Sequence, residues 1–256
     1  MRTPTSTHIS TSMTEHLALT RLLQLCSANL PIGGFAFSQG LEPAIEAGWI
    51  SNKVELQQWV STIMTEAMLN TDLPLLHKQR QAIVAGDAEA FNNNEDWICA
   101  TRETSEILMA EKAIGSALLR LLKNLEFDQS APTLKWLGEH KKLSFISSFA
   151  MASYLFELDT EATLTGFAWA FIDNQVAAGV KLIPLGQTDG QNLLFTLSTL
   201  IPTSVKQCIK NCESDTNRCN ANATQLIDNT KIGQSLAGLA IASSKHEQQY
   251  SRLFRS

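Results

Sequence analysis

Apolar residues recur three or four positions apart along almost the whole chain, which is the spacing of one face of an α-helix. The clearest run lies between Val54 and Met68, where an apolar residue returns at each helical turn. No segment shows the sustained two-residue alternation that marks a half-buried β-strand. The sequence therefore predicts an all-α protein, a single-domain helical bundle of roughly ten helices.

Size and charge narrow the class of protein. The 256 residues, of which 44% are hydrophobic and 18% are charged, can bury a full core in one large domain or in two. A low proportion of charged residues leaves apolar surface to cover, which favours an oligomer or a permanent partner. The net charge of -5, without a dense basic run, argues against nucleic acid as the main ligand.

The first 14 residues differ from the rest of the chain. They are rich in Ser and Thr and lack the apolar core of an export signal, so we expect a disordered tail over 1–14, a helical domain over 15–256 and a cytoplasmic protein. The longest apolar region, 164–183, contains Asp173, Asn174 and Lys181, which would be costly in lipid. We expect a buried helix there and no membrane span.

Glycine, proline and capping residues set the expected helix boundaries. Gly48 and Gly86 should end helices, Ser51 and Asp87 should begin them, and the asparagine run at 92–94 should interrupt one. We expect helices over 15–26, 38–47, 51–68, 73–86, 87–91, 95–125, from Pro132 onward, and over 145–156, 160–180, 189–200 and 232–250.

A glycine-rich segment over 28–42 separates the first two expected helices. Pro31, Gly33 and Gly34 predict a shaped turn, because glycine adopts backbone angles that side chains forbid. Ser38 should cap the next helix, with Glu42 in its first turn. Such a turn can also bind an anion, yet neither Gly-Lys-Ser/Thr nor Gly-x-Gly-x-x-Gly is present. We expect an ordered structural turn.

Two segments carry aromatic residues suited to partner binding. Phe35 and Phe37 in the glycine turn are two positions apart, so one can pack inward while the other faces a groove or a partner. The C-terminal segment 251–256 is expected to be an interaction tail that orders on binding, and a tail folded back on its own bundle is the alternative. The residues of this tail region with binding chemistry are Tyr250, Arg252, Phe254 and Arg255.

Recognisable motifs of catalysis are missing from the sequence. The five histidines are scattered without His-x-x-x-His or His-Glu-x-x-His spacing, and Gly-x-Ser-x-Gly does not occur. We therefore expect a protein that is not an enzyme, needs no cofactor and acts by holding its partners.

Charged residues near helix ends have both structural and binding interpretations. Glu103 and Glu106 could present two carboxylates on one helix face, whereas Arg102 and Glu106 could form a surface ion pair that contributes only about 0–1 kcal/mol. Lys181 follows an apolar helix, where a cation either interacts with the helix dipole or faces an acidic partner. Both interpretations stay open for each segment.

Residues 203–224 differ in composition from the helices around them. Cys208, Cys212 and Cys219 lie here and could bind a soft metal such as zinc. Their spacing is not Cys-x-x-Cys, however, and no histidine is close in the sequence. We expect an insertion loop with incidental thiols, and a metal-binding carrier that uses these three cysteines is the alternative.

Four segments, in order along the chain, resemble the signatures of the UreF family of urease accessory proteins. They are 30–42 (Leu-Pro-Ile-Gly-Gly-Phe-Ala-Phe-Ser-Gln-Gly-Leu-Glu), 102–106 followed by Gly115 and 118–121, then 181–191, and finally 240–256. On this resemblance the residues expected to bind partners are Pro31, Gly33, Gly34, Phe35, Ser38, Glu42, Arg102, Glu103, Lys181, Gln187, His246, Tyr250, Arg252, Phe254 and Arg255.

The resemblance implies a cytoplasmic chaperone-like factor for nickel insertion into urease. It implies a homodimer that bridges the accessory protein UreD (UreH) and the GTPase UreG, regulates UreG and serves apo-urease, without binding GTP itself. The sequence departs from the family pattern in two places. Gln39 stands where many members have histidine, so no nickel ligand is assigned in the turn, and the 203–224 segment is longer than usual.

Overall fold

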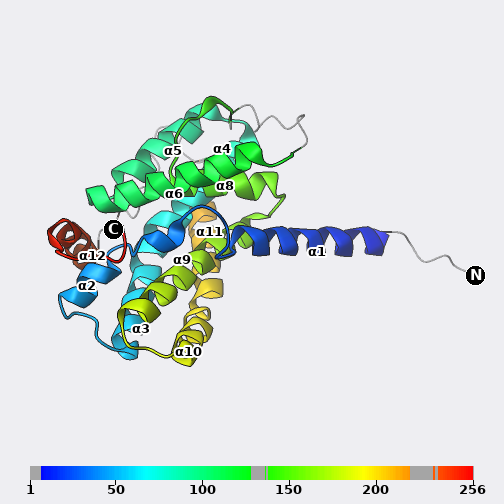
Figure 1. Cartoon of the computed structure of the whole chain (residues 1–256). Coiled ribbons are helices and arrows are strands. Elements are labelled where there is room, and N and C mark those ends of the chain that lie inside the picture. Colours follow the sequence, from blue (N-terminus) through cyan, green and yellow to red (C-terminus); the bar gives the residue numbers. More distant parts are fainter. Residues whose placement is uncertain (1–6, 128–135, 137, 220–232, 234–235, 256) are drawn as a thin grey trace, which may run out of the picture.

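The chain folds into an all-α bundle (Figure 1). The computed structural model describes residues 7–127, 136, 138–219, 233 and 236–255, and these residues contain helices and turns but no strand. None of the described helices combines the length and hydropathy that a bilayer crossing requires.

The N-terminal half of the chain contains the glycine turn and the segment around Arg102. The bounds of its elements are α1 (Thr7–Leu25), the 3₁₀ turn η1 (Gly34–Ala36), α2 (Leu41–Glu46), α3 (Lys53–Thr62), the π-helix η2 (Ile63–Asp72), α4 (Leu73–Ala85), α5 (Ala88–Ala100) and α6 (Ser105–Asn124).

The C-terminal half supplies the buried centre and the closing segment. Its elements are α8 (Phe145–Leu155), α9 (Thr160–Leu182), α10 (Gln187–Leu197), α11 (Leu200–Cys219), α12 (Ala237–Ser244) and the 3₁₀ turn η4 (Lys245–Gln248). In Figure 1, α1 projects from one side of the bundle, while α12 and the C-terminus lie on the opposite side.

Helix α8 forms the centre of the bundle and packs mainly against α4 and α6. It is apolar on most sides, as the sequence indicates, and Ile146, Phe149 and Ala150 are almost completely buried. The Phe149 ring meets that of Phe167 on α9 edge to face, with centroids 5.3 Å apart. The expected central position of residues 145–156 is confirmed.

Close contact between α6 and α8 depends on Gly115. A Cβ at this position would collide with the backbone of Leu143 and Ser144, which begins α8. The glycine therefore allows a helix to touch the backbone of another segment directly, at the modest cost in helix propensity that glycine brings.

Three expected boundaries in the first half are wrong. Helix α1 begins at Thr7 rather than at residue 15, since extending an existing helix costs much less than starting one. The asparagine run at 92–94 continues α5. The single helix expected over 95–125 is divided, because the Thr104 side chain caps α6 by accepting from the Ile107 backbone N–H at 3.2 Å.

The expected restart at Leu73 does not occur. The π-helix η2 follows α3 directly and leads without a break into α4, with Pro74 within its first turn, where the missing proline N–H costs little. Two caps also differ: Asn52 rather than Ser51 caps α3, and Gly40 rather than Ser38 precedes α2. Asp87 and Gly86 cap their helices as expected.

The insertion loop expected over 203–224 is helical as far as Cys219. Val205, Cys208 and Cys212 are buried, and their spacing of three and four residues places them on one side of α11, against the core. In the last part of the chain, the helix expected over 232–250 is confined to Ala237–Ser244 and is followed by a 3₁₀ turn. Residues 1–6, 128–135, 137, 220–232, 234–235 and 256 lie outside the described residues, so the helix expected from Pro132 onward falls partly among them.

We predict that Gly115→Ala destabilises the protein by about 1–3 kcal/mol, because the added methyl group forces α6 away from the start of α8. Chemical denaturation followed by circular dichroism measures this change. Gly238→Ala in α12 is the matched control, since a Cβ there meets no atom within 4 Å. Equal stability of the two variants would contradict the role assigned to Gly115.

Buried His77 on α4 should make the fold sensitive to acid. The residue is 7% exposed, and neither ring nitrogen has a hydrogen-bond partner among the described residues. Burial lowers the pKa of His77, and the nearby cations Arg80 and Lys78 lower it further, against an opposing effect of Glu213. His77 therefore binds a proton more readily in the unfolded chain than in the folded chain. As a result, the free energy of unfolding is highest above the ordinary histidine pKa of about 6.5 and decreases as the pH drops below it.

We predict that the loss of stability between neutral and mildly acidic pH is smaller in His77→Leu than in the unmodified protein. Urea denaturation at a series of pH values measures it. His16→Gln, a change at an exposed histidine of α1, should leave the pH profile unaltered. An identical profile for His77→Leu would contradict the prediction.

Candidate functional site

The structure brings the glycine turn and the C-terminal tail together. The backbone N–H of Arg255 donates to the Ala36 carbonyl at 2.8 Å, and the Phe254 side chain is buried with 6% exposed. The two segments expected to bind partners therefore form one continuous region, although more than two hundred residues separate them in the sequence. The tail lies on its own bundle, which is the alternative interpretation of this segment.

Glu42 fixes the tail through its buried carboxylate. The two oxygens accept from the backbone N–H groups of Leu253, at 2.6 Å, and Phe254, at 3.0 Å. The N–H of Glu42 donates in turn to Ser38 Oγ at 3.3 Å. Charge-assisted bonds of this kind are stronger than neutral ones, and here they satisfy backbone groups that would otherwise be buried without a partner.

Two further residues expected to bind partners contact Phe254. The Lys181 ammonium lies 5.9 Å from the centre of the Phe254 ring, within the range of a cation–π interaction. The imidazole Nε2 of His246 is 3.3 Å from the Phe254 carbonyl oxygen, and His246 is 2% exposed. Lys181 and His246 thus hold the chain's own tail in this structure.

The glycine turn is held from beneath by α9. The side-chain amide of Asn174 donates to the Phe37 carbonyl at 3.1 Å, and that of Gln175 donates to the Ser38 carbonyl at 2.9 Å. Gln39 has a φ of 51°, a left-handed conformation that is uncommon for a residue with a side chain. The two side-chain amides hold this part of the turn in place and Gln39 in an uncommon conformation, so the turn is ordered, as expected.

Three large apolar side chains remain exposed on these joined segments, and we call them the tail–turn surface: Phe35, Tyr250 and Leu253. Tyr250 is fully exposed, while Phe35 is 64% and Leu253 is 65% exposed. Phe37 faces inward with 4% exposed, so the two phenylalanines of the turn divide as expected. Nearby, the Arg252 guanidinium donates to the Glu247 carbonyl, and Pro31 is exposed at the start of the turn.

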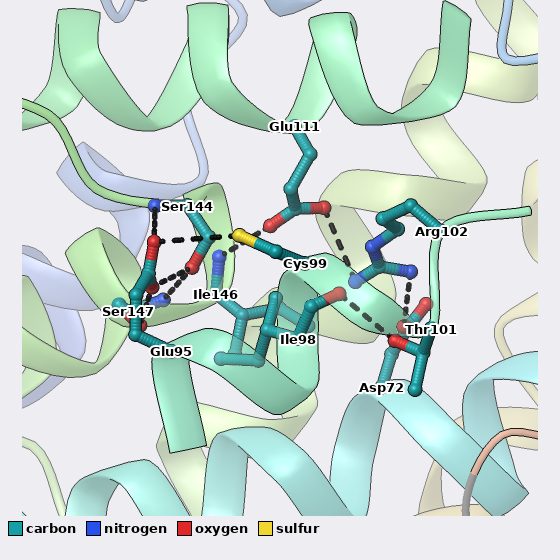
Figure 2. Close-up of polar contacts among 10 residues, drawn as sticks. All are labelled: Asp72, Glu95, Ile98, Cys99, Thr101, Arg102, Glu111, Ser144, Ile146 and Ser147. Carbon is teal, nitrogen blue, oxygen red and sulfur yellow. Dashed lines mark hydrogen bonds and ion pairs between the residues drawn. The ribbon is translucent and has the colours of Figure 1, made fainter. Parts of the chain in front are cut away.

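Arg102 belongs to a buried charge network rather than to the surface (Figure 2). Its guanidinium pairs with Asp72 at 2.7 Å and with Glu111 at 3.2 Å, and its side chain is only 10% exposed. Burial alone would lower the pKa of Arg102, but the two carboxylates raise it overall. Of the two interpretations left open for this segment, a surface pair between Arg102 and Glu106 does not form, because Asp72 and Glu111 are the partners of Arg102.

The same network reaches the beginning of α8. Glu111 accepts from the Ile146 backbone N–H at 2.9 Å, and burial raises the pKa of Glu111 in spite of Arg102. Beside it, Glu95 accepts from the Ser144 N–H at 2.9 Å and from the hydroxyl groups of Ser144 and Ser147 at 2.6 and 2.5 Å. Figure 2 shows the two acidic residues on either side of this helix start.

Residue spacing in the sequence does not indicate Asp72, Glu95 or Glu111 as members of this network. Glu111 lies within a helix between apolar turns, and an acidic residue at a core-facing position was the signal available for it. The remaining expected residues are not part of the network: Glu103 is exposed beside Arg102, and Gln187 is exposed at the first residue of α10.

The cysteines of α11 are core residues. Cys208 is fully buried and Cys212 is 8% exposed, and neither cysteine is in a disulfide. The Cys212 side chain and burial together raise the pKa of Cys208, which keeps it protonated and unsuited to a metal. The Cys219 side chain lies outside the described residues, and the described part of the chain holds no group of three histidine, cysteine or acidic side chains that could bind a metal ion. The arrangement does not support a metal carrier.

Comparisons with known proteins place this helical chain in a single family. The family model described as UreF matches residues 50–198. A urease accessory protein UreF from Marinomonas sp. (strain MWYL1) is 38% identical over 95% of this chain and 96% of the relative. The UreF of Chromohalobacter salexigens is 36% identical over 96% of this chain and 97% of the relative, and that of Pseudomonas putida (strain W619) is 36% identical over 95% and 100%.

The chain belongs to the UreF family of urease accessory proteins. The resemblance carried by the four sequence segments is confirmed.

We predict that Arg102→Met lowers the free energy of unfolding by about 3–5 kcal/mol, because it leaves Asp72 and Glu111 buried without a counter-charge. Lys53→Met is the matched control: Lys53 pairs with Asp189 at 2.8 Å, but both side chains are more than a third exposed. Its loss should cost only about 0–1 kcal/mol. Denaturant titration of both variants gives the comparison, and similar losses would show that the Arg102 network does not stabilise the fold.

Proposed function

We propose that this protein acts in urease maturation, in the functional incorporation of the nickel centre, as a chaperone-like protein that bridges UreD (UreH) and the GTPase UreG. In this role it works by contact with UreD, UreG and apo-urease, regulates GTP hydrolysis by UreG, and carries out no reaction of its own. The similarity to UreF proteins over nearly the whole chain supports the proposal. So do the low fraction of charged residues and the absence of recognisable catalytic motifs from the sequence.

The observation that carries the contact role is the tail–turn surface. Aromatic residues are enriched in protein interfaces, and tyrosine is among the residues that most often account for their binding energy. Here Phe35, Tyr250 and Leu253 are exposed on backbone that Glu42 and Ala36 hold in place. A surface already ordered in the free protein loses less conformational entropy on binding than a disordered tail does. We therefore assign UreD binding to this surface.

Lys181 extends the same region with a positive charge. It is exposed at the end of α9 and lies beside Phe254, so it can meet an acidic group of a partner while it holds the tail. A homodimer, which the low charge fraction favours, would present two such surfaces to two UreG molecules. We place this assembly in the cytoplasm.

We predict that deletion of residues 250–256 abolishes co-purification with UreD while the helical content stays intact. The double variant Tyr250→Ala/Leu253→Ala removes two exposed side chains but keeps the backbone bonds to Glu42, so it should weaken co-purification without releasing the tail. Val84→Ala, which removes an exposed apolar side chain on α4, is the control. Unchanged co-purification of both tail variants would count against the assignment of this surface.

The function as a whole is tested in cells that express the complete urease cluster. A tagged form of the protein should recover UreD, UreG and apo-urease, and urease activity at limiting nickel should be lost when the protein is absent. Normal maturation without it, or turnover of a small molecule by the isolated chain, would overturn the proposal.

A further inference from the structure

A cavity of about 220 Å³ lies between the glycine turn and the Arg102 network. Segments that are distant in sequence enclose it: the end of α1, the glycine turn, η2, the junction of α5 and α6 with the first half of α6, the start of α8, α9, and the residues at the start of α12. Its wall is largely apolar. Contributing side chains include Leu25, Ile63, Met68, Phe167, Phe171 and Leu239.

The charged groups of this cavity are mostly acidic. Its lining contains four carboxylates and one cation, with no lysine and no histidine. Two of the carboxylates, Asp72 and Glu111, are paired with Arg102. The other two, Glu103 and Asp173, form no ion pair with a described residue, so an apolar cavity is left with an excess of negative charge.

Asp173 is the carboxylate with the strongest need of a partner. It is half-buried on α9 and makes no hydrogen bond or ion pair with any described residue. Burial raises the pKa of Asp173, and its negative charge helps burial to raise the pKa of the neighbouring Cys26 thiol. A carboxylate that is partly removed from water and left unpaired costs free energy in the unbound protein, and a bound cation would recover that cost.

The lining also offers a hydrogen-bond donor that is unused, on Arg102. Arg102 lines the cavity with its side chain 90% buried, and its Nε–H has no acceptor among the described residues. The adjoining π-helix η2 contributes Ile63, Met68 and Asp72 to the wall. π-Helical segments are rare in proteins, and those that occur are often found at functional sites. An occupant that pairs with Asp173 and also binds Arg102 Nε–H must supply a cation and a hydrogen-bond acceptor.

We propose that this cavity receives an arginine side chain from a partner protein, with the guanidinium paired to Asp173 and a backbone carbonyl of the same partner segment accepting from Arg102 Nε. The aliphatic stem of arginine packs against the apolar wall, as long cationic side chains do at interfaces. The guanidinium group of arginine is also more weakly hydrated than the ammonium group of lysine, which suits an ion pair that is partly removed from water.

Size and ligand chemistry favour this occupant over the alternatives. Pockets for cofactors and drug-sized ligands have volumes of about 300–1,000 Å³, so this cavity is small for them and suits one side chain. The described part of the chain offers no group of three metal-binding side chains here. The proposal rests on the proposed function only in requiring a protein partner, and the cavity itself is tested without one.

The direct test uses ethylguanidinium, which reproduces the end of an arginine side chain, and ethylurea, its neutral analogue of similar shape. Titration of the full chain followed by nuclear magnetic resonance should show saturable shifts at lining residues such as Phe171 and Ala67 with ethylguanidinium and not with ethylurea. Asp173→Asn should weaken the binding about tenfold or more, because it removes the charge partner. Asp189→Asn, at an exposed carboxylate of α10, should bind ethylguanidinium normally.

Stability separates a binding role of Asp173 from a structural one. Because the carboxylate is unpaired, Asp173→Asn should melt at the same temperature as the unmodified protein or at a higher one, while it binds ethylguanidinium less tightly. No saturable shift at the highest soluble concentration, equal binding by Asp173→Asn, or a lower melting temperature of that variant would each overturn the proposal. Loss of UreD or UreG binding through the tail–turn surface would not affect this titration, so the two proposals fail independently.

Discussion

The start of the central helix depends on the carboxylates of Glu95 and Glu111. The first N–H groups of any α-helix have no partner within the helix, and in α8 they lie inside the protein, away from water. Glu95 and Glu111 accept from Ser144 and Ile146 and so satisfy two backbone groups at this buried end. Glu111 requires Arg102 as a counter-charge, and Arg102 in turn holds Asp72 at the end of η2. The need to satisfy the first N–H groups of α8 thus connects the core, through Glu111 and Arg102, to Asp72 in the wall of the cavity.

Periodicity predicted the class of fold and the buried centre well, because both follow from where apolar residues lie along each segment. The run from Phe145 is an example, since it is apolar on most sides and becomes the buried helix α8. Boundaries were predicted less well. The division at Thr104 and the continuation of α11 through Cys208 depend on contacts between segments that are far apart in sequence, and composition over a short window carries no information about such contacts.

The tail and the charge network show the same limit at the level of single residues. Glu42 was recognised as part of a family segment, but its bonds to Leu253 and Phe254 join the two ends of the chain and could not be predicted from spacing. Arg102 was recognised for the same reason, while its true partners are 30 residues earlier, for Asp72, and nine later, for Glu111. Resemblance alone selected these residues, and the structure shows that Glu42 and Arg102 bind other segments of the same chain.

The π-helix η2 makes the length of the chain between α3 and α4 a sensitive quantity. Each residue of an α-helix turns the chain by about 100°. The removal of one residue from η2 would therefore restore α-helical winding and rotate α4 and the later helices relative to α3 and the earlier ones. Asp72 closes this segment and faces Arg102, and the start of α8 depends on that pair through Glu111. A substitution in η2 therefore changes the contacts of one side chain, whereas an insertion or deletion there would shift the helix register of the residues that follow.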